Sequence, residues 1–479
     1  MPRSTNPGQG DFVGRAAELA VLERELERRG GAFVPVYGRR RVGKSELILH
    51  FLSRHRGIYH VGKEAPATLQ VQELLDAASV ALDEPLLREL RARDWRAALV
   101  AIEERFRGPG KLVLALDEFQ WSAAASPELP SILQELWDTR WRRSGKVMLI
   151  LCGSFVGFME RDVLGEKSPL FGRRTAQIHL APFGYRDAGR FHPSWSVMDQ
   201  ARAWFICGGI PAYLLAFDEG ESIESNVETT LLSEYGPLFH EPEFLLREEL
   251  RDVSSYHGVL MAVAAGAGTA REIAERTGLP ERSLPYYLEQ LVSLGYVGRR
   301  YPVFGRKPAA RHVRFSLEDA LLRFWFRFVF PHKSAIVRLG SKRALDQIVR
   351  PSLDSYFGSC FERLCRDALA DEYASRGVTG PTEVGSYWDK HVQIDVVGVR
   401  GDHRIDLAEC KWGPVRSRSA VEAELAAKAK LFPNPDGNTV ALRWFTRTAP
   451  KSGAAPGWTT LDDLYAGTKR AARRRSRRS

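Results

Sequence analysis

The stretch that decides the fold is an eight-residue loop near the N-terminus, Gly38-Arg39-Arg40-Arg41-Val42-Gly43-Lys44-Ser45. It matches the pattern G-x-x-x-x-G-K-[ST], in which backbone N–H groups beside the glycines close around phosphate groups. The pattern is informative where a strand precedes it and a helix follows it. Residues 32–37 are a short apolar run that predicts a buried strand, and residues 44–53 predict a helix. The sequence therefore predicts a phosphate-binding loop in the context that the motif requires.

The residue types in this loop point to ATP with Mg²⁺. The side chain of Lys44 can reach the β- and γ-phosphates, and the hydroxyl of Ser45 can ligate Mg²⁺. All eight residues are therefore candidate nucleotide contacts. The alternative is a chance match in an ordinary turn, and the flanking strand and helix argue against it.

A second apolar run supports the same site. Residues 112–116, LVLAL, end in Asp117 and Glu118. An acid at the end of a buried strand can hold the Mg²⁺ shell, so Asp117 is a candidate metal ligand. Glu118 can polarise the attacking water and is the candidate catalytic base. Acids at strand ends also serve as helix caps, which is the alternative. Ser154, after the run 149–152, can sense the γ-phosphate or the water, or it is a serine in an ordinary turn.

Strands and helices alternate around this loop. A helix is expected at 16–29, where Leu19, Leu22 and Leu26 fall at helical spacing. Further along, strands are expected at 111–116 and 146–152, with a helix at 130–140 between them. This order predicts a parallel sheet covered on both faces. We assign it to an ATPase domain over residues 1–217, followed by an acidic helical connector over 218–250.

Residues 251–345 have the layout of a winged helix-turn-helix. Helices are expected at 259–264, 269–276 and 281–294, with Thr269 as an N-cap. Two strands are expected at 296–300 and 312–317, around a basic loop. The aromatic run at 321–330 predicts a buried helix.

Contact with DNA is one interpretation of this domain. The third helix offers little positive charge, but the hairpin region can bind phosphates through Arg299, Arg300, Arg306, Lys307, Arg311 and Arg314. A rigid spacer or a protein-interaction module is the alternative.

The chain resembles a known family. It is similar to the archaeal-type ATPases with a C-terminal DUF234 domain, a branch close to the AAA+ and STAND ATPases. The resemblance covers nearly the whole chain and rests on FVGR at 12–15, YGRRRVGKS at 37–45, LDEFQ at 116–120, CGS at 152–154, PLFGRRT at 169–175, GGIPAYL at 208–214 and LRFWFRF at 322–328. It implies an ASCE-type sheet, with an extra strand between the phosphate-loop strand and the strand that carries the acids.

The resemblance also implies an arginine that stabilises charge on the leaving phosphate, in cis or from a neighbouring subunit. Arg173 and Arg174 are the candidates, and we favour Arg173 as a catalytic residue. A surface or salt-bridged arginine is the alternative.

Residues 346–468 are expected to form an α/β domain with a second site. A helix is expected at 356–370, strands at 391–399, 404–411 and 439–445, and a helix at 420–431. Asp395 lies in one strand, and Glu409 and Lys411 end the next, pointing to the same face. This resembles the D…E-x-K pattern of restriction-endonuclease-like, PD-(D/E)XK nucleases.

The chemistry of that pattern is coherent. Asp395 and Glu409 would bind Mg²⁺, which polarises the phosphate, and Lys411 would orient or deprotonate the water or stabilise developing charge. Glu362, on the preceding helix, can supply another carboxylate. Ile394 stands where the pattern commonly has proline, so an inactive domain that binds nucleic acid or a partner is the alternative.

Charge and cysteine content limit the class of protein. The net charge is +10, but the last eleven residues, 469–479, hold seven Lys or Arg and no acid, which leaves about +3 for the rest. We expect this basic tail to be disordered, and it can be an arm that binds phosphates or simply a solvated end. Five scattered cysteines argue against a disulfide framework and a structural zinc site. With no apolar run long enough to span a bilayer, the sequence predicts a cytoplasmic protein without membrane contact.

Three functions therefore stay open for this α/β multidomain chain. The first is an ATP-dependent machine that acts on nucleic acid. The second is a STAND-like switch in which ATP controls self-assembly, so that the chain would form homo-oligomers. The third is an ATP-linked regulator that binds DNA through the winged helix.

Overall fold

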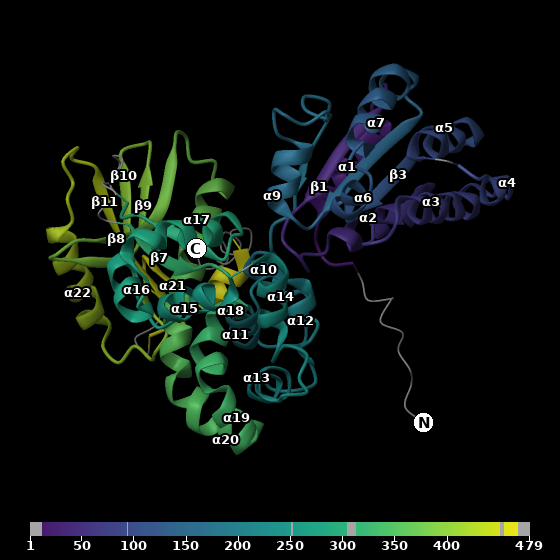
Figure 1. The fold of residues 1–479 in the computed structure, drawn as a ribbon. Coiled ribbons are helices and arrows are strands. Elements are labelled where there is room, and N and C mark those ends of the chain that lie inside the picture. The colour runs from purple at the N-terminus through teal and green to yellow at the C-terminus, as the bar shows by residue number, and fades with distance from the viewer. Residues whose placement is uncertain (1–11, 93, 251, 304–312, 451–454, 468–479) are drawn as a thin grey trace. The chain divides into compact units, whose positions relative to one another are not determined.

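A computed structural model describes residues 12–92, 94–250, 252–303, 313–450 and 455–467. These residues form two compact units (Figure 1). The first runs to Pro182 and includes Ile210–Ala212, and the second holds Phe183–Gly209 and the chain from Tyr213 onward. The first unit therefore ends before residue 217, the end assigned to this domain from the sequence. Residues 183–209 belong to the second unit because Tyr185 donates a hydrogen bond to the carbonyl of Leu464 (3.1 Å) and the ring of Phe205 packs against Trp412.

The first unit is an α/β domain. Its strands are β1 (Ala32–Tyr37), β2 (Gly57–Val61), β3 (Leu112–Asp117), β4 (Val147–Gly153) and β5 (Ile178–His179). Its helices are α1 (Ala16–Glu27), α2 (Lys44–Leu52), α3 (Ala67–Leu82), α4 (Leu86–Glu89), α5 (Trp95–Arg105), α6 (Phe119–Ala125), α7 (Leu129–Leu136), α8 (Arg142–Ser144) and α9 (Val156–Phe158). The expected helix at 130–140 is α7 followed by a π-helical turn at Trp137–Trp141.

Within the described residues, the sheet of this unit has five strands in the order β2-β3-β4-β1-β5, and all paired strands are parallel. The prediction of a parallel sheet is therefore confirmed. Strand β4 lies between β1 and β3, as the family resemblance implied. Strands β1, β3 and β4 are buried along their whole length, which explains their continuous apolar sequences. The carboxyl ends of β1 and β3, which carry the phosphate loop and the acids, meet at one edge of the sheet.

His60, on β2, lies inside the core of this unit. Its side chain is 3% exposed, its ring meets Trp95 edge to face at 5.6 Å, and its Nε2 atom has no hydrogen-bond partner among the described atoms. Burial lowers the pKa of His60 to about 4. The unfolded chain therefore binds a proton near pH 6.5, whereas the folded chain does so only near pH 4.

We expect His60→Leu to reduce the loss of stability that the wild type shows as the pH falls below about 6.5. In the wild type, the contribution of a neutral His60 is complete above about pH 6.5 and is lost as the pH falls toward about 4, a loss on the order of 3 kcal/mol. The free energy of unfolding of the first unit, measured in urea at pH 7.5 and pH 5, tests this. Between pH 7.5 and pH 5, the free energy of unfolding should fall less in His60→Leu than in the wild type. An equal fall in both proteins would contradict the prediction.

The second unit begins with helices and a two-stranded ladder. The helices are α10 (Tyr185–Gly189), α11 (Val197–Cys207), α12 (Pro211–Leu214), where the chain passes between units, α13 (Ile223–Val227), α14 (Glu241–Glu249), α15 (Val253–Ala264), α16 (Ala270–Thr277), α17 (Leu284–Ser293), α18 (Ala320–Phe324), α19 (Lys333–Leu339), α20 (Ser341–Ala344), α21 (Arg350–Ser375) and α22 (Arg418–Leu431). The strands β6 (Val297–Arg300) and β7 (Arg314–Leu317) pair antiparallel.

The order of elements in 253–317 follows the expected three helices and a hairpin. Thr269 caps α16 in a capping box with Glu272, as expected from its side chain. The expected third helix starts as a 3₁₀ turn at Glu281–Ser283 before α17. The basic residues Arg306, Lys307 and Arg311 of the expected wing lie outside the described residues, as does the basic tail 469–479.

The aromatic run at 321–330 is core, as predicted. It forms α18 and a π-helical turn at Trp325–Val329. Phe324 and Trp325 are 0% exposed, and the indole of Trp325 donates to the carbonyl of Phe239 at 2.8 Å. Because this polar atom has a partner, the ring can be buried completely.

A second sheet lies in the C-terminal part. Its strands are β8 (Thr382–Trp388), β9 (Gln393–Arg400), β10 (Arg404–Lys411), β11 (Thr439–Thr446) and β12 (Trp458–Thr460), in the order β12-β11-β10-β9-β8. Strands β8, β9 and β10 are antiparallel, whereas β10, β11 and β12 are parallel. Helix α21 packs on one face of this sheet and α22 on the other, since neighbouring residues of β10 contact different helices. Tyr373 of α21 hydrogen-bonds Asp406 of β10, and Leu425 of α22 shares a core with Leu407.

No helix among the described residues has both the length and the apolar character needed to cross a membrane.

Candidate active sites

The phosphate loop joins β1 to α2 and folds around its own lysine. Gly38 has φ +151° and Gly43 has φ +89°, and a Cβ on Gly38 would lie 2.4 Å from the carbonyl oxygen of Leu180. These two positions therefore require glycine. The Nζ atom of Lys44 is held by the carbonyls of Gly38 (3.0 Å) and Arg39 (2.9 Å). Burial lowers the pKa of Lys44, and its ammonium lies at the centre of the loop.

Asp117 contacts the other candidate metal ligand, Ser45. It is 1% exposed, and its Oδ2 atom accepts hydrogen bonds from the hydroxyls of Ser45 and Tyr59, both at 2.6 Å. Its Oδ1 atom accepts from the backbone N–H of Glu118 at 2.8 Å. The structure thus brings together Ser45 and Asp117, 72 residues apart, as the sequence predicted. A hydroxyl and a carboxylate side by side are the oxygen donors that Mg²⁺ uses, so this donor set fits the ion.

Glu118 projects from the same strand end and is held by polar side chains. Its backbone is left-handed, with φ +47°. Its Oε2 atom accepts from the Ser154 hydroxyl at 2.7 Å and from the amide of Gln120. Ser154 comes from the end of β4, so the extra strand of the sheet supplies a contact to the candidate base. Such positioning is typical of catalytic carboxylates, and strained backbone is common at such sites.

Three residues of this site had no role assigned from the sequence. Tyr59 lies on β2, a strand that the sequence analysis did not predict. Gln120 belongs to the LDEFQ run and binds Glu118. Arg15 belongs to the FVGR run, and its NH2 atom donates to the carbonyl of Val42 in the loop at 3.0 Å. The family resemblance contained the last two residues, but only the fold shows what they touch.

The arginines around the loop lie in separate environments. The guanidinium of Arg40 stacks over the ring of Phe155, 5.2 Å from its centroid. Arg173 forms an ion pair with Asp138 (2.7 Å) and donates to the carbonyls of Pro169 and Phe171. None of these described acceptors of Arg173 belongs to the phosphate loop, so a catalytic role of Arg173 stays a prediction.

The second candidate site lies on the C-terminal sheet. Val396 of β9 pairs with Ala408 of β10. Asp395 and Glu409 are the next residues of the two antiparallel strands, on the same side of this pair. The Oδ2 atom of Asp395 accepts from the backbone N–H of Cys410 at 3.0 Å. Glu409 is 4% exposed, and Lys411 and Lys428 each hold one of its carboxylate oxygens, at 2.8 and 2.7 Å. Lys428, on α22, is a partner that the sequence pattern did not predict.

Glu362 lies close enough to Asp395 and Glu409 to interact with their charges. Burial, and then the charge of Asp395, raise the pKa of Glu362 to about 7. Burial, and then the charge of Glu409, raise the pKa of Asp395. The predicted carboxylates therefore lie close enough to repel one another. No group of three or more His, Cys, Asp or Glu side chains in the described part of the chain is arranged to hold a metal ion, so the fit to Mg²⁺ rests on the pair Asp395 and Glu409.

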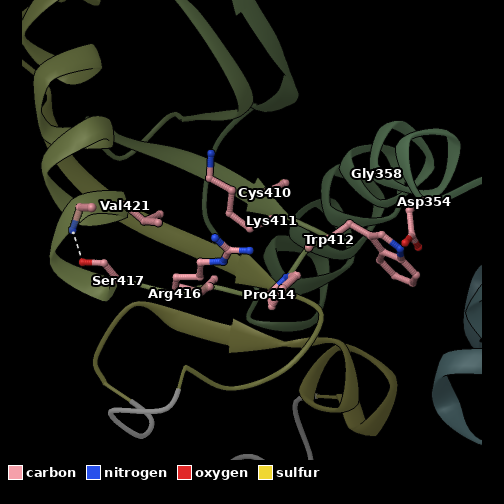
Figure 2. Close-up of a pocket in the computed structure, with 12 residues that line it drawn as sticks. Asp354, Gly358, Cys410, Lys411, Trp412, Pro414, Arg416, Ser417 and Val421 are labelled. Atoms are coloured by element: carbon pink, nitrogen blue, oxygen red, sulfur yellow. Dashed lines mark hydrogen bonds between the residues drawn. The ribbon is translucent and has the colours of Figure 1, made fainter. Parts of the chain in front are cut away.

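A pocket of about 530 Å³ opens beside the end of β10 (Figure 2). Lys411, Arg416 and Ser417 line one part of it, and Asp354 of α21 lines another. The hydroxyl of Ser417 caps α22 by accepting from the N–H of Ala420 at 3.3 Å. The lysine of the E-x-K pattern thus borders an open, partly basic space.

Two family models match the chain. Residues 12–217 match the ATPase domain found predominantly in Archaea, and residues 325–423 match DUF234, a family of archaeal and bacterial proteins of unknown function. The chain joins an archaeal-type ATPase domain to a DUF234 domain. The match of residues 12–217 supports ATPase activity at the level of the family.

Three individual proteins illustrate what this chain is similar to. An uncharacterized protein of Methanocaldococcus jannaschii is 26% identical over 429 residues, which are 88% of this chain and 92% of that protein. A Walker-type ATPase of Pyrococcus abyssi has a similar structure, with a TM-score of 0.50 and 21% identity, over 66% of this chain and 96% of that one. ORC2 of Aeropyrum pernix, in ADPNP and ADP complexes, matches at a TM-score of 0.42 and 16% identity, over 72% of this chain and 96% of that one. The match to the Pyrococcus protein shows a shared fold and nothing beyond it.

Proposed function

We propose that this chain is a Mg²⁺-dependent ATPase whose nucleotide state controls a nuclease-like site acting on nucleic acid. The observation that carries the ATPase part is the contact of Ser45 and Asp117 beside Lys44, with Glu118 next in the chain. ATP turnover by the full chain, in Mg²⁺ and in EDTA, tests it. Turnover should require Mg²⁺ and disappear in Lys44→Ala, and turnover that survives this change would refute the assignment.

Each residue of the ATP site has a task in this proposal. Lys44 would exchange its two carbonyl partners for phosphate oxygens. Ser45 and Asp117 would hold Mg²⁺, which neutralises phosphate charge when it is bound. Glu118, held by Ser154 and Gln120, would orient the attacking water and accept its proton.

Tyr59→Phe should weaken Mg²⁺ binding without removing catalysis. The Tyr59 hydroxyl donates to the Asp117 oxygen that also accepts from Ser45, and so it fixes the orientation of this carboxylate. Loss of such a supporting hydrogen bond costs about 10-fold or more in metal affinity. ATP turnover titrated with Mg²⁺ measures this. The half-saturating Mg²⁺ concentration should rise, and an unchanged concentration would show that Tyr59 does not position Asp117.

For Arg173, we expect slower ATP turnover in Arg173→Ala. The arginine would leave Asp138 and stabilise charge on the leaving phosphate, in its own subunit or in a neighbouring one. The measurement is ATP turnover at saturating ATP, with Asp138→Asn as a matched control that removes the ion pair but keeps the arginine. A normal rate in Arg173→Ala would eliminate this role.

The C-terminal site supports action on nucleic acid. The order of elements supports this part of the proposal: a helix, three antiparallel strands, a helix and a parallel strand. Asp395 and Glu409 lie on neighbouring strands, and Lys411 forms an ion pair with Glu409. Asp395 and Glu409 would hold Mg²⁺, and Lys411 would orient the water or stabilise charge on the phosphodiester. The helices and hairpin of 253–317 would contribute DNA contacts through a winged helix.

A second candidate is a STAND-like switch with an inert C-terminal domain. The observation that favours it is the state of Glu409, whose two oxygens are both engaged by lysines. This candidate predicts oligomers that form with ATP and no cleavage of nucleic acid. Light scattering of the full chain with and without ATP distinguishes the two functions when it is read beside a cleavage assay.

A further inference from the structure

A cavity of about 470 Å³ in the second unit lies beside the candidate nuclease site, with which it shares Glu362. Its lining also includes Arg299 and Arg300, two arginines of the hairpin predicted to bind phosphates. It lies where β6, β7, α21 and β8 meet, with the end of α15 on another side. We call it the arginine cavity, because Arg299, Arg300, Arg323, Arg363 and Arg366 line it. The acidic side chains in its lining are Glu362 and Glu383. The lining therefore carries more positive than negative charge.

Arg299 forms an ion pair with Glu289. The partners of the other four arginines leave part of their charge uncompensated. Glu318, behind the cavity, is shared by Arg300 (2.8 Å) and Arg363. Arg366 donates to the backbone carbonyl of Asp395 at 2.9 Å, and Glu362 is 3.8 Å away. Arg323 donates to the carbonyl of Leu317 at 3.3 Å. Carbonyls satisfy hydrogen bonds but do not neutralise a guanidinium.

The pKa of Arg363 reflects its burial and the positive charge around the cavity. Burial, and then the neighbouring Arg323, lower the pKa of Arg363 to about 10, against the opposing effect of Glu318. Arg300 and Arg366 act in the same direction as Arg323. Like charges therefore repel one another around the cavity, and an anion there would relieve the repulsion.

The remaining lining describes the kind of anion that fits. Guanidinium forks match the geometry of phosphate oxygens. Tyr301, 41% exposed, and Phe315 add aromatic surface on which a base can stack. The volume is in the range of sites for small ligands.

We propose that the arginine cavity binds the phosphate group of a nucleotide unit, either within a nucleic-acid strand or as a free nucleotide. Glu362 lines the cavity and also faces Asp395. A strand held there would lead to the candidate nuclease residues, and this part of the inference rests on the proposed function. Binding itself does not require that the C-terminal site cleave anything.

The test uses the full chain with Lys44→Ala, so that the ATP loop does not contribute phosphate binding. The probe is a fluorescein-labelled single-stranded oligonucleotide of about 12 nucleotides in EDTA, followed by anisotropy. We expect Arg300→Gln to weaken binding by about 10-fold, because a charge-assisted contact is lost. Glu383→Gln should tighten binding by about 3-fold, since this exposed carboxylate repels phosphate. Arg96→Gln, an exposed arginine of α5 paired with Glu135, is the charge-matched control and should bind as the parent does.

The Glu383→Gln arm keeps the test decisive if Arg300→Gln fails to fold, because a folding defect does not tighten binding. Competition with AMP and with inorganic pyrophosphate identifies the source of the phosphate. Displacement of the probe by AMP would show a nucleotide site, and displacement only by unlabelled oligonucleotide would show a strand site. The proposal fails if the parent protein does not bind the probe, if Arg300→Gln and Glu383→Gln both bind like the parent, or if Arg96→Gln loses as much affinity as Arg300→Gln. EDTA prevents metal-dependent cleavage, so an inert nuclease site would leave these results unchanged.

Discussion

Glu118→Gln should lower ATP turnover by about 10² to 10⁴-fold while ATP still binds. The carboxylate is held by Ser154 and Gln120 at the end of β3, one residue after Asp117. Glutamine has the same shape and can keep the hydrogen bond from Ser154, but it cannot accept a proton from water. The loss therefore concerns the chemical step and not the binding of nucleotide or Mg²⁺.

Two measurements separate these effects. Single-turnover hydrolysis should be slow in Glu118→Gln, whereas the dissociation constant of a fluorescent ATP analogue should stay within about threefold of the wild type. Glu64→Gln, an exposed glutamate in the same unit, is the matched control and should behave as the wild type in both assays. Equal loss of binding and turnover in Glu118→Gln would show that Glu118 builds the site and is not its base.

Asp395→Asn should abolish metal-dependent cleavage of nucleic acid, a loss of about 10³-fold or more. Asparagine can still accept the N–H of Cys410, so the end of β9 should keep its structure. It removes one of two carboxylates, Asp395 and Glu409, that the proposal assigns to Mg²⁺. The effect is large because a missing metal ion removes charge stabilisation from the whole transition state.

The control is Asp402→Asn, in the turn between β9 and β10, where the aspartate pairs with Arg400. This variant should cleave as the wild type does. Asp395→Asn should still bind the oligonucleotide probe in EDTA, which shows that the domain is folded. Cleavage that persists in Asp395→Asn would remove the metal role from this residue.

The arrangement of the candidate ATP site was largely predictable because its residues lie in short, contiguous motifs. Gly38, Lys44 and Ser45 follow a buried strand, and Asp117 ends another, so a parallel sheet must bring them to the same edge. Tyr59 could not be predicted in this way. Its strand has only five residues and alternates buried and partly exposed positions, so it lacks the continuous apolar run of β1 and β3.

The C-terminal site was predictable only in part. Asp395 and Glu409 meet because β9 and β10 are consecutive antiparallel strands, and the spacing in the sequence indicates that pairing. Lys428 is 19 residues from Glu409 and reaches it through the packing of α22, which leaves no local signal. Strand β8 was missed as well, since its first residues are exposed and it contains Gly385. The ion pair of Arg173 with Asp138 depends likewise on how two distant segments fold.

The most direct test of the central claim is cleavage of plasmid, linear and single-stranded DNA by the full chain. It should be measured in Mg²⁺ or Mn²⁺, with and without ATP, beside Lys44→Ala. If the nucleotide state controls the C-terminal site, wild-type cleavage will change with ATP, and Lys44→Ala will cleave to the same extent whether or not ATP is present. Cleavage in the wild type that is independent of ATP, or no cleavage of any substrate, would contradict nucleotide control of a nuclease site. The proposed ATPase activity alone would then remain.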